Sequence, residues 1–280
     1  MKIMVIGTGT MGTGIAQVLA QNNYNIILKG RTYESLNKSL GQIEKILNKS
    51  IEKGKLSNSH KNEILKNITL TTEINMAKNC DLIIEAISED INAKKDLFKV
   101  LDELCEEKTI LATNTSSLSI TDIAMSTNRP EKVIGMHFFN PVNIMNLVEV
   151  IDGILTSQEV KEKIIELIKS IGKTPVSVKE SPGFVVNRML IPMINEAIGI
   201  LSEGVASKED IDTSMKLGAN HPIGPLALAD LIGNDVCLAI MEILHKEFGD
   251  SKYRPHPLLI KMVRGGLLGR KTKRGFYEYQ

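Results

Sequence analysis

The sequence predicts an α/β protein, with an N-terminal Rossmann-like doubly wound sheet over residues 1–183 and a C-terminal all-α domain over residues 184–280. Short apolar runs alternate with helical segments along the first part, and a glycine-rich loop follows the first of these runs. Strands that alternate with helices pair in parallel through right-handed crossovers, which gives a doubly wound sheet. From Phe184 onward the apolar residues recur at helical spacing, and this predicts the all-α part.

The composition allows two domains and argues against several classes of protein. A chain of 280 residues has room for two domains of roughly 100–200 residues each. Lys and Arg number 34 against 33 Asp and Glu, so the basic excess typical of a nucleic-acid-binding protein is absent. No apolar run is long enough to span a membrane, and the three cysteines have neither metal-binding nor paired spacing. We therefore expect a cytoplasmic protein with no metal and with no nucleic-acid or membrane partner.

The first 54 residues carry a clear strand and helix pattern. The apolar run at residues 3–6 is ended by glycine, as expected of a buried parallel strand. A helix over 14–19 and a second strand over 25–28 follow, and then residues 34–54 predict a long helix with one apolar face.

The rest of the first domain is expected to continue this alternation. The later elements expected are strands at 68–72, 81–87, 109–112, 132–136 and 148–151, and a helix at 93–104 with Leu97, Val100, Leu101 and Leu104 facing inward.

The second domain is expected to be built from apolar helices. The first of them has an apolar face formed by Val185, Met189, Met193, Ala197, Ile200 and Leu201. Residues 207–210 form a capping box that starts a further helix, and Gly218 ends it. Residues 225–247 predict one long apolar helix. This apolar surface is buried either in a partner subunit, as a homodimer, or against the chain's own sheet domain.

The glycine loop has the form G-x-G-x-x-G and lies between the first strand and the first helix. Its residues are Gly7, Thr8, Gly9, Thr10, Met11 and Gly12. In this context Gly7 allows the tight turn, Gly9 lets the backbone approach a pyrophosphate, and Gly12 allows close helix–strand packing. The helix N-terminus then offers N–H groups to the phosphates. The loop predicts a dinucleotide site, and a glycine turn without a ligand is the alternative.

The end of the second strand predicts which dinucleotide is bound. An NAD site usually has Asp or Glu about 20 residues after the loop, to hold the ribose hydroxyls. This chain has Gly30 there, followed by Arg31 and Thr32. Gly30 removes the charge that would repel a 2′-phosphate, Arg31 can clamp that phosphate, and Thr32 can donate a hydroxyl. The pattern favours NADP(H), with NAD still possible; the alternative is a solvated basic turn beside a site indifferent to the phosphate.

Polar residues follow two further strands, at the edge where a parallel sheet faces its ligand. Asn114 to Ser117 come after the strand at 109–112, and His137 comes after the strand at 132–136. A single histidine in such a place is more often structural than catalytic. Here Glu149 could reach a ring nitrogen and fix the tautomer, and histidine is suited to moving a proton near neutral pH. The pair could protonate the oxygen formed when a carbonyl accepts hydride.

These residues resemble the short-chain 3-hydroxyacyl-CoA dehydrogenase family, and within it most closely the bacterial 3-hydroxybutyryl-CoA dehydrogenases. The resemblance spans nearly the full length in the right order. The segments that carry it are 7–12, 81–89, 114–120, 135–141, 147–150, 181–188, 210–221 and 275–277. One departure is that most of the family has an acid where this chain has Gly30, which puts the usual NAD preference in doubt.

The resemblance implies roles for individual residues. His137 would be the catalytic acid and base, Glu149 would orient it, and Ser116 and Asn187 would hydrogen-bond the reacting oxygen or its surroundings. The residues implied at the cofactor are Glu89, Lys94, Asn114 and Asn140, with Lys271 reaching it from the C-terminal part. Lys49 and Lys53 lie where the family handles the CoA tail, although a lysine-rich helix end is usually only solvated.

The predicted function is reversible reduction of acetoacetyl-CoA to 3-hydroxybutyryl-CoA, with NADP(H) preferred, no metal, and a proton supplied by His137. A homodimer through the helical domain is expected. Two alternatives stay open. One is a dehydrogenase for a free 3-hydroxy acid, and the other is a non-catalytic nucleotide-binding protein that has kept only the fold.

Overall fold

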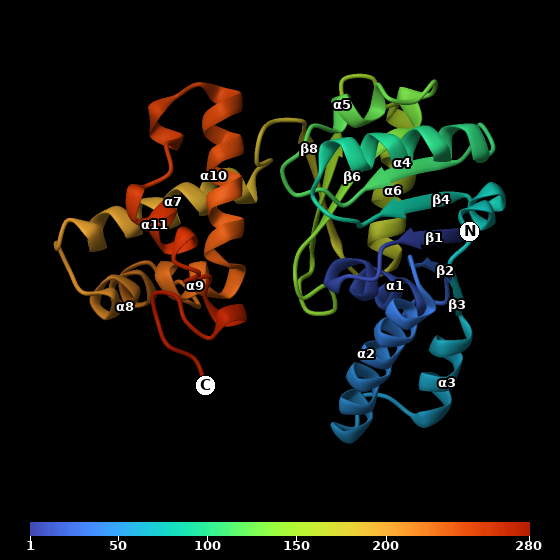
Figure 1. The fold of residues 1–280 in the computed structure, drawn as a ribbon. Coiled ribbons are helices and arrows are strands. Elements are labelled where there is room, and N and C mark those ends of the chain that lie inside the picture. Colours follow the sequence, from blue (N-terminus) through green and yellow to red (C-terminus); the bar gives the residue numbers. More distant parts are fainter. The chain divides into compact units, whose positions relative to one another are not determined.

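The computed structural model describes residues 1–280, and the chain divides into two units, Met1–Glu180 and Ser181–Gln280. Each unit has a hydrophobic core of its own. The first unit contains a sheet with helices on it, and the second is built from helices (Figure 1). The predicted fold class is thereby confirmed. None of the helices combines the length with the apolar composition needed to cross a bilayer.

An eight-stranded sheet forms the middle of the first unit, in the order β3-β2-β1-β4-β5-β6-β7-β8. The strands are β1 Lys2–Ile6, β2 Asn25–Lys29, β3 Ile68–Thr71, β4 Leu82–Glu85, β5 Ile110–Thr113, β6 Val133–Phe138, β7 Leu147–Asp152 and β8 Thr174–Lys179. The strands from β3 to β6 in this order pair in parallel. The strand order reverses between β1 and β4, which is where an open α/β sheet forms its ligand crevice, outside the carboxyl ends of the strands.

The last two strands depart from the expected all-parallel pattern. β7 runs antiparallel to β6, and β8 then pairs in parallel with β7. Residues 139–146 alone join β6 to β7, and a connection of this length leaves no room for the helical crossover that a parallel return requires. β8 was not among the expected strands, because only one of its six residues is buried and its sequence lacks an apolar run.

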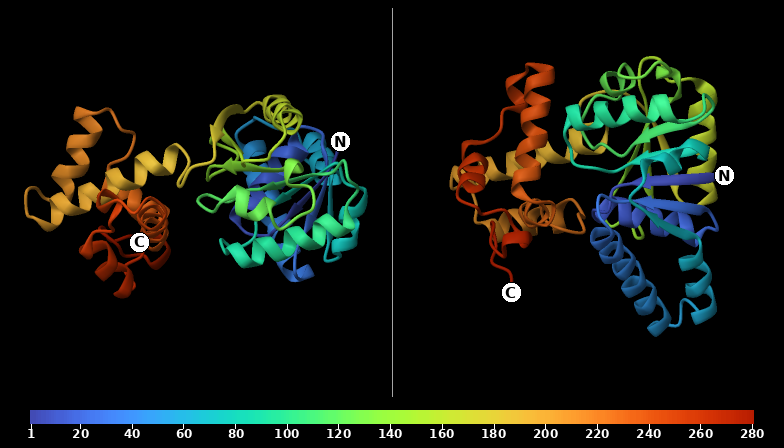
Figure 2. Two further views of the ribbon diagram at one scale, coloured as in Figure 1. Left: turned by 90° about the horizontal axis from the view of Figure 1, so that it is seen from above. Right: turned by 45° about the vertical axis from the view of Figure 1, so that its right-hand side comes forward.

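Helices cover both faces of this sheet. They are α1 Thr10–Gln21, α2 Tyr33–Glu52, α3 Asn58–Lys66, α4 Ile91–Leu104, α5 Ile120–Ala124 and α6 Gln158–Ser170. Apolar residues of α1, α2 and α6 share one hydrophobic cluster with Ile3 and Val5 of β1, whose neighbour Met4 faces the other side. α2 and α3 contact one another and project from the sheet (Figure 2).

The inward face of α4 differs from the predicted one. Val100 is exposed, whereas Phe98 is fully buried together with Leu101 and Lys94. These three residues are spaced i, i+4 and i+7, so they do form one helix face. The prediction for Val100 was wrong because one member of the buried face is a lysine, which a hydropathy pattern assigns to solvent.

The second unit contains five α-helices, with a core to which each of them contributes. They are α7 Val186–Ser202, α8 Lys208–Gly218, α9 Pro225–Ile232, α10 Asn234–Phe248 and α11 Pro257–Arg264. The capping prediction is confirmed, because the Ser207 hydroxyl accepts a hydrogen bond from the Asp210 amide and α8 ends at Gly218.

One prediction for this unit is wrong, and a second is right only in part. The single helix expected over 225–247 is divided into α9 and α10 at Gly233, whose φ of +109° lies outside the helical region and suits only glycine. On α7 the expected face is right at Ala197, which is buried, and at Ile200 and Leu201, which pack against the core. It is wrong at Met189 and at Val185 just before the helix, which are exposed, and it leaves out the buried Ile191, Ile194 and Ile198. α7 is apolar on most of its circumference, so spacing alone does not select the face that packs.

Candidate active site

The ends of β6 and β7 hold a histidine and a carboxylate directly opposite each other. His137 and Glu149 are partners in the antiparallel ladder, so their side chains emerge on the same face of the sheet. The His137 Nδ1 lies 2.8 Å from Glu149 Oε2, and both side chains are buried. With the carboxylate ionised, Nδ1 carries the proton of this hydrogen bond. Nε2 is therefore the ring nitrogen suited to exchanging a proton with a substrate.

The surroundings of His137 are fixed by its chain neighbours. The Phe139 ring lies against the imidazole, with centroids 4.4 Å apart. Asn114 follows β5, and its Oδ1 accepts a hydrogen bond of 3.0 Å from the Phe138 amide. This contact ties the end of β5 to the end of β6. The structure thus brings Asn114 and His137 to the same edge of the sheet, with Asn140 shortly beyond.

Glu89 organises the loop that carries Ser116. Its Oε1 accepts hydrogen bonds from the Thr115 hydroxyl at 2.6 Å and from the Ser116 amide and hydroxyl at 2.7 and 3.1 Å. The Lys94 ammonium lies 3.4 Å from the other carboxylate oxygen, Oε2. Burial raises the pKa of Glu89, but the Lys94 charge and these hydrogen bonds outweigh burial and hold it below its usual value. Glu89 is therefore ionised at neutral pH.

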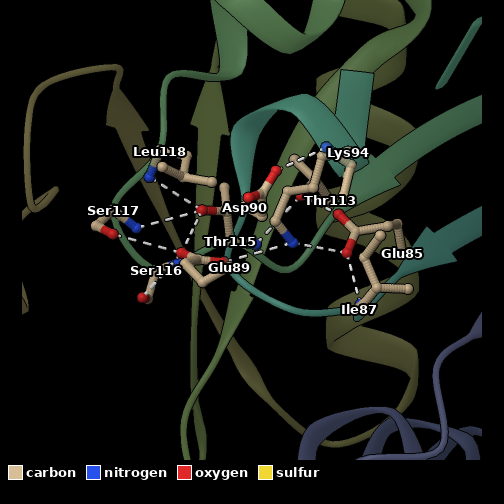
Figure 3. A network of polar contacts seen from close by, with 11 residues as sticks. Glu85, Ile87, Glu89, Asp90, Lys94, Thr113, Thr115, Ser116, Ser117 and Leu118 are labelled. Atoms are coloured by element: carbon tan, nitrogen blue, oxygen red, sulfur yellow. Dashed lines mark hydrogen bonds and ion pairs between the residues drawn. The ribbon is translucent and has the colours of Figure 1, made fainter. Parts of the chain in front are cut away.

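A second carboxylate lies on the other side of the Lys94 ammonium from Glu89, as Figure 3 shows. Glu85 is the last residue of β4 and is fully buried, with one of its oxygens 2.6 Å from Lys94 Nζ. The same carboxylate accepts hydrogen bonds from the Ile87 amide and the Thr113 hydroxyl. Sequence reasoning missed Glu85 and Thr113. The available signal was a charged residue inside an otherwise apolar strand, which has to find a buried partner.

The glycine loop has the geometry of a cradle for phosphates. Gly7 has a φ of +128°, and a Cβ there would lie 2.3 Å from the Ala86 carbonyl oxygen. A Cβ on Gly12 would lie 2.1 Å from the Gly7 oxygen, whereas one on Gly9 would meet nothing within 4 Å. Protein packing therefore explains the first and third glycines. The space at Gly9 suits the close approach of a ligand.

The N-terminus of α1 also suits a phosphate group. α1 begins at Thr10, followed by Met11, and its N-cap residue is Gly9, so no side chain caps the helix. The other five α-helices of this unit each have a Ser, Thr or Asp side chain that accepts an amide hydrogen bond at the N-terminus. Unsatisfied amides at one helix end, beside a glycine turn, match the needs of an anionic pyrophosphate.

The three residues after β2, Gly30 to Thr32, have different surroundings. A Cβ on Gly30 would lie 2.7 Å from Leu36 Cγ and 2.9 Å from Thr8 Cγ2, so a larger residue requires these side chains to move. The Thr32 hydroxyl oxygen accepts a hydrogen bond from the Ser35 amide and caps α2. Arg31 is exposed to solvent. A neutral, sterically filled position is thus followed by an exposed guanidinium.

Four predicted residues lie apart from this sheet edge or in the other unit. Lys49 and Lys53 are exposed at the C-terminal end of α2. Asn187 belongs to the second unit, where it is buried in the first turn of α7. Lys271, also in that unit, forms an ion pair with Asp235.

A doubly wound sheet with this glycine loop and a histidine–carboxylate pair at the same strand ends belongs to the class of nicotinamide-dependent dehydrogenases. The comparisons with known proteins agree. The model of the 3-hydroxyacyl-CoA dehydrogenase NAD binding domain matches residues 2–181, and that of the 3-hydroxyacyl-CoA dehydrogenase C-terminal domain matches residues 183–279. The chain therefore belongs to the 3-hydroxyacyl-CoA dehydrogenase family, as its motifs predicted, and its first unit is a nicotinamide dinucleotide-binding domain.

Individual relatives are similar over the whole chain. The 3-hydroxybutyryl-CoA dehydrogenase of Clostridioides difficile is 63% identical over 279 residues, which are 100% of this chain and 99% of the relative. The mitochondrial hydroxyacyl-coenzyme A dehydrogenase of Homo sapiens is 43% identical over 285 residues, covering 99% and 91%. The crystal structure of (S)-3-hydroxybutyryl-CoA dehydrogenase from Ralstonia eutropha superposes with a TM-score of 0.97 at 48% identity, covering 100% and 99%.

Proposed function

We propose that the protein catalyses the reversible reduction of acetoacetyl-CoA to 3-hydroxybutyryl-CoA, with NADP(H) preferred over NAD(H). The buried His137–Glu149 pair carries this proposal, because it lies at the strand ends of a dinucleotide-binding sheet in a chain of the 3-hydroxyacyl-CoA dehydrogenase family. The names of the similar proteins from Clostridioides difficile and Ralstonia eutropha support the choice of substrate.

The histidine moves the proton of the reaction. In the reduction, His137 Nε2 gives a proton to the C3 oxygen, and in the oxidation it takes that proton back. The buried Glu149 carboxylate at Nδ1 stabilises the charged imidazole and fixes the direction of the ring. When bound, the nicotinamide supplies or accepts the hydride at C3. Ser116 and Asn187 hydrogen-bond the reacting oxygen or its surroundings.

The residues for the cofactor follow from the same sheet edge. Gly7, Gly9, Thr10, Met11 and Gly12 surround the pyrophosphate. Glu89, Asn114 and Asn140 serve the nicotinamide end, with Lys271 contributing from the second unit. Lys94 is 1% exposed and enclosed between two carboxylates, so its contribution is indirect, through Glu89. Lys49 and Lys53 bind phosphates of CoA.

The NADP preference rests on Gly30, Arg31 and Thr32. The packing of Leu36 and Thr8 against Gly30 supports it, because these side chains occupy the space that an acidic residue would need. The exposed Arg31 guanidinium can then form a charge-assisted hydrogen bond with a 2′-phosphate, worth about 1.5–3 kcal/mol.

The test is to measure kcat/KM for acetoacetyl-CoA reduction with NADPH and with NADH. The wild-type enzyme should favour NADPH, and Arg31→Leu should lower the NADPH-to-NADH ratio by roughly 10–100-fold. Lys66→Leu, which removes an exposed cation at the end of α3, is the matched control and should leave the ratio unchanged. A wild-type preference for NADH, or a ratio that Arg31→Leu does not alter, would contradict the cofactor assignment. Activity on free acetoacetate in place of the thioester would favour a dehydrogenase for free 3-hydroxy acids.

The protein is further proposed to act in the cytoplasm as a homodimer through its second unit. Large apolar side chains exposed on that unit, among them Met189, Val205 and Leu217, support this assembly. Sedimentation analysis that finds only a monomer at micromolar concentration would contradict it.

A further inference from the structure

One buried carboxylate at the cofactor edge has no role in the proposed proton transfer. Glu85 is fully buried, and each oxygen of its carboxylate has a donor within 2.7 Å. Its strongest partner is Lys94, whose ammonium lies 2.6 Å away and is itself 1% exposed. A buried ion pair of this kind contributes little net stability, because desolvation offsets most of the attraction. Its presence therefore calls for another reason.

Lys94 also pairs with a second carboxylate, Glu89, which lies nearer the surface. Lys94 Nζ lies 2.6 Å from Glu85 and 3.4 Å from Glu89, so the lysine is shared unequally and is held chiefly by Glu85. The Glu89 side chain is 37% exposed and is the outer end of the series. Through its Oε1 it accepts hydrogen bonds from the hydroxyls of Thr115, Ser116 and Ser117 and from the Ser116 amide.

The series ends on the loop that carries Ser116. Within that loop the Thr115 hydroxyl oxygen accepts hydrogen bonds from the Ser117 and Leu118 amides, and its proton goes to Glu89 (Figure 3). The position of the Glu89 carboxylate therefore sets the shape of this turn. A shift of Glu89 towards the interior would remove an acceptor from the Ser116 amide and hydroxyl together.

We propose that Glu85 is a positioning residue for this site: it holds the Lys94 ammonium in place, so that Glu89 stays beneath the loop and directs Ser116. This inference rests on the proposed function, in which Ser116 contacts the reacting oxygen. Without the Glu85 charge, Lys94 has Glu89 as its remaining anionic partner among the contacts above. A buried ammonium that loses one partner draws the other closer, because an uncompensated buried charge is costly. The lowered pKa of Glu89 agrees, since Glu89 remains charged and able to respond.

A double-mutant cycle tests this route. Glu85→Gln, Ser116→Ala and the double variant are compared by kcat/KM for acetoacetyl-CoA. We expect Glu85→Gln to lower kcat/KM by about tenfold or more in the wild-type background, and by less than about threefold when Ser116 is already Ala. Equal losses in the two backgrounds would overturn the inference, because residues that act independently have additive effects.

Asp102→Asn is the matched control for simple destabilisation. Asp102 is also a buried carboxylate paired with a cation, Arg129 at 2.6 Å, and it lies at the other end of α4. It should leave kcat/KM unchanged. If Asp102→Asn reduces kcat/KM as much as Glu85→Gln does, the effect is one of stability and the inference fails.

Hydrogen exchange supplies a readout that needs no substrate. In Glu85→Gln the amides of Ser116, Ser117 and Leu118 should exchange faster than in the wild type, while Asp102→Asn leaves them unchanged. Unaltered exchange in Glu85→Gln would overturn the inference while leaving the proposed function intact. A wild-type enzyme inactive on acetoacetyl-CoA would overturn the proposed function, and this inference with it.

Discussion

In the first unit a buried carboxylate lies beside a cation near each end of the strands, Glu85 at the end of β4 and Asp102 on the last turn of α4. The hydrogen-bond networks of these two carboxylates lead to different places. At the amino ends of the strands, Asp102 binds Asn128 and Arg129, and Arg129 also donates to the main-chain carbonyls of Cys105 and Glu106. At the carboxyl ends, Glu85 leads through Lys94 to Glu89, which is partly exposed. The first network closes on the backbone, whereas the second reaches the ligand edge.

Burial and pairing alone therefore do not identify a functional group. Both carboxylates have a cation at 2.6 Å. What differs is the last member of each network. In the Asp102 network the last members are main-chain carbonyl groups just after α4, which accept hydrogen bonds from Arg129 in the segment before β6. In the Glu85 network the last member is the loop that carries Ser116.

The largest expected effect tests whether proton transfer takes place at the carboxyl ends of the strands, where His137 lies. His137→Gln should lower kcat by roughly 10²–10⁴-fold, because general acid–base catalysis contributes about that factor. Binding of the dinucleotide should be largely kept, as fluorescence titration can establish. Unchanged turnover in this variant would remove the proton-transfer assignment.

The next effect tests whether the amino ends are purely structural. Asp102→Asn should lower the free energy of unfolding by roughly 3 kcal/mol, since it breaks a buried ion pair, and should leave kcat/KM unchanged. Urea unfolding at neutral pH, followed with steady-state kinetics on the folded enzyme, measures both quantities. Impaired kcat/KM at full folding would mean that the two ends of the sheet are not separate in function.

The pH dependence of this stabilisation has a definite sign. Burial raises the pKa of Asp102, but the hydrogen bonds from Asn128 and Arg129 outweigh burial and hold it below its usual value. A lowered pKa in the folded state stabilises the protein above the unfolded pKa of about 3.9, and that stabilisation is lost as the pH falls through the folded pKa. Asp102→Asn should therefore reduce the loss of stability on acidification below about pH 4. An acid transition as steep as that of the wild type would contradict this account.

The smallest of these effects sharpens the description of the ligand edge. In Gly12→Ala the added Cβ would clash with the Gly7 carbonyl oxygen. Overpacking of this kind typically lowers the free energy of unfolding by about 1–3 kcal/mol. The turn must shift, so NADPH should bind about tenfold more weakly. Gly41→Ala on α2 is the control, because its Cβ has open space, and it should leave the dissociation constant unchanged. Equal affinity in Gly12→Ala and the wild type would mean that the turn is not part of the cofactor site.

The sequence allowed the location of those candidate residues to be predicted that depend on the ends of strands. The glycine loop and His137 could be located because each follows an apolar run, and the proximity of Glu149 follows from a strand that starts soon after. Glu85 could not be assigned, because its role depends on a lysine nine residues away whose own burial contradicts its hydropathy. Hydropathy describes single residues, and a buried pair of opposite charges is a property of two.

The same limit explains the errors in the fold. The break at Gly233 lies inside a stretch that is apolar on both sides, so the composition does not mark it. Asn234, the first residue of α10, is buried, and its side-chain amide donates hydrogen bonds to Asp230 and to the Leu267 carbonyl. The exposed Val100 and Met189 lie on helices where more than one face is apolar or where a charged residue is buried. In each case the tertiary partner decides, and a local pattern does not contain it.

The antiparallel ladder of β6 and β7 has a consequence for how this protein can vary. His137 and Glu149 face each other because of strand register, so shifting either strand by one residue would move one of the two groups to the opposite face. The connecting loop at residues 139–146 is tied to the same arrangement, because its Phe139 ring lies against the imidazole and its Val142 is buried in the core of the unit. The two strand positions and the loop between them must therefore be inherited together. A change in the length of the loop would disturb the His137–Glu149 pair, because loop length helps to set the register of a hairpin.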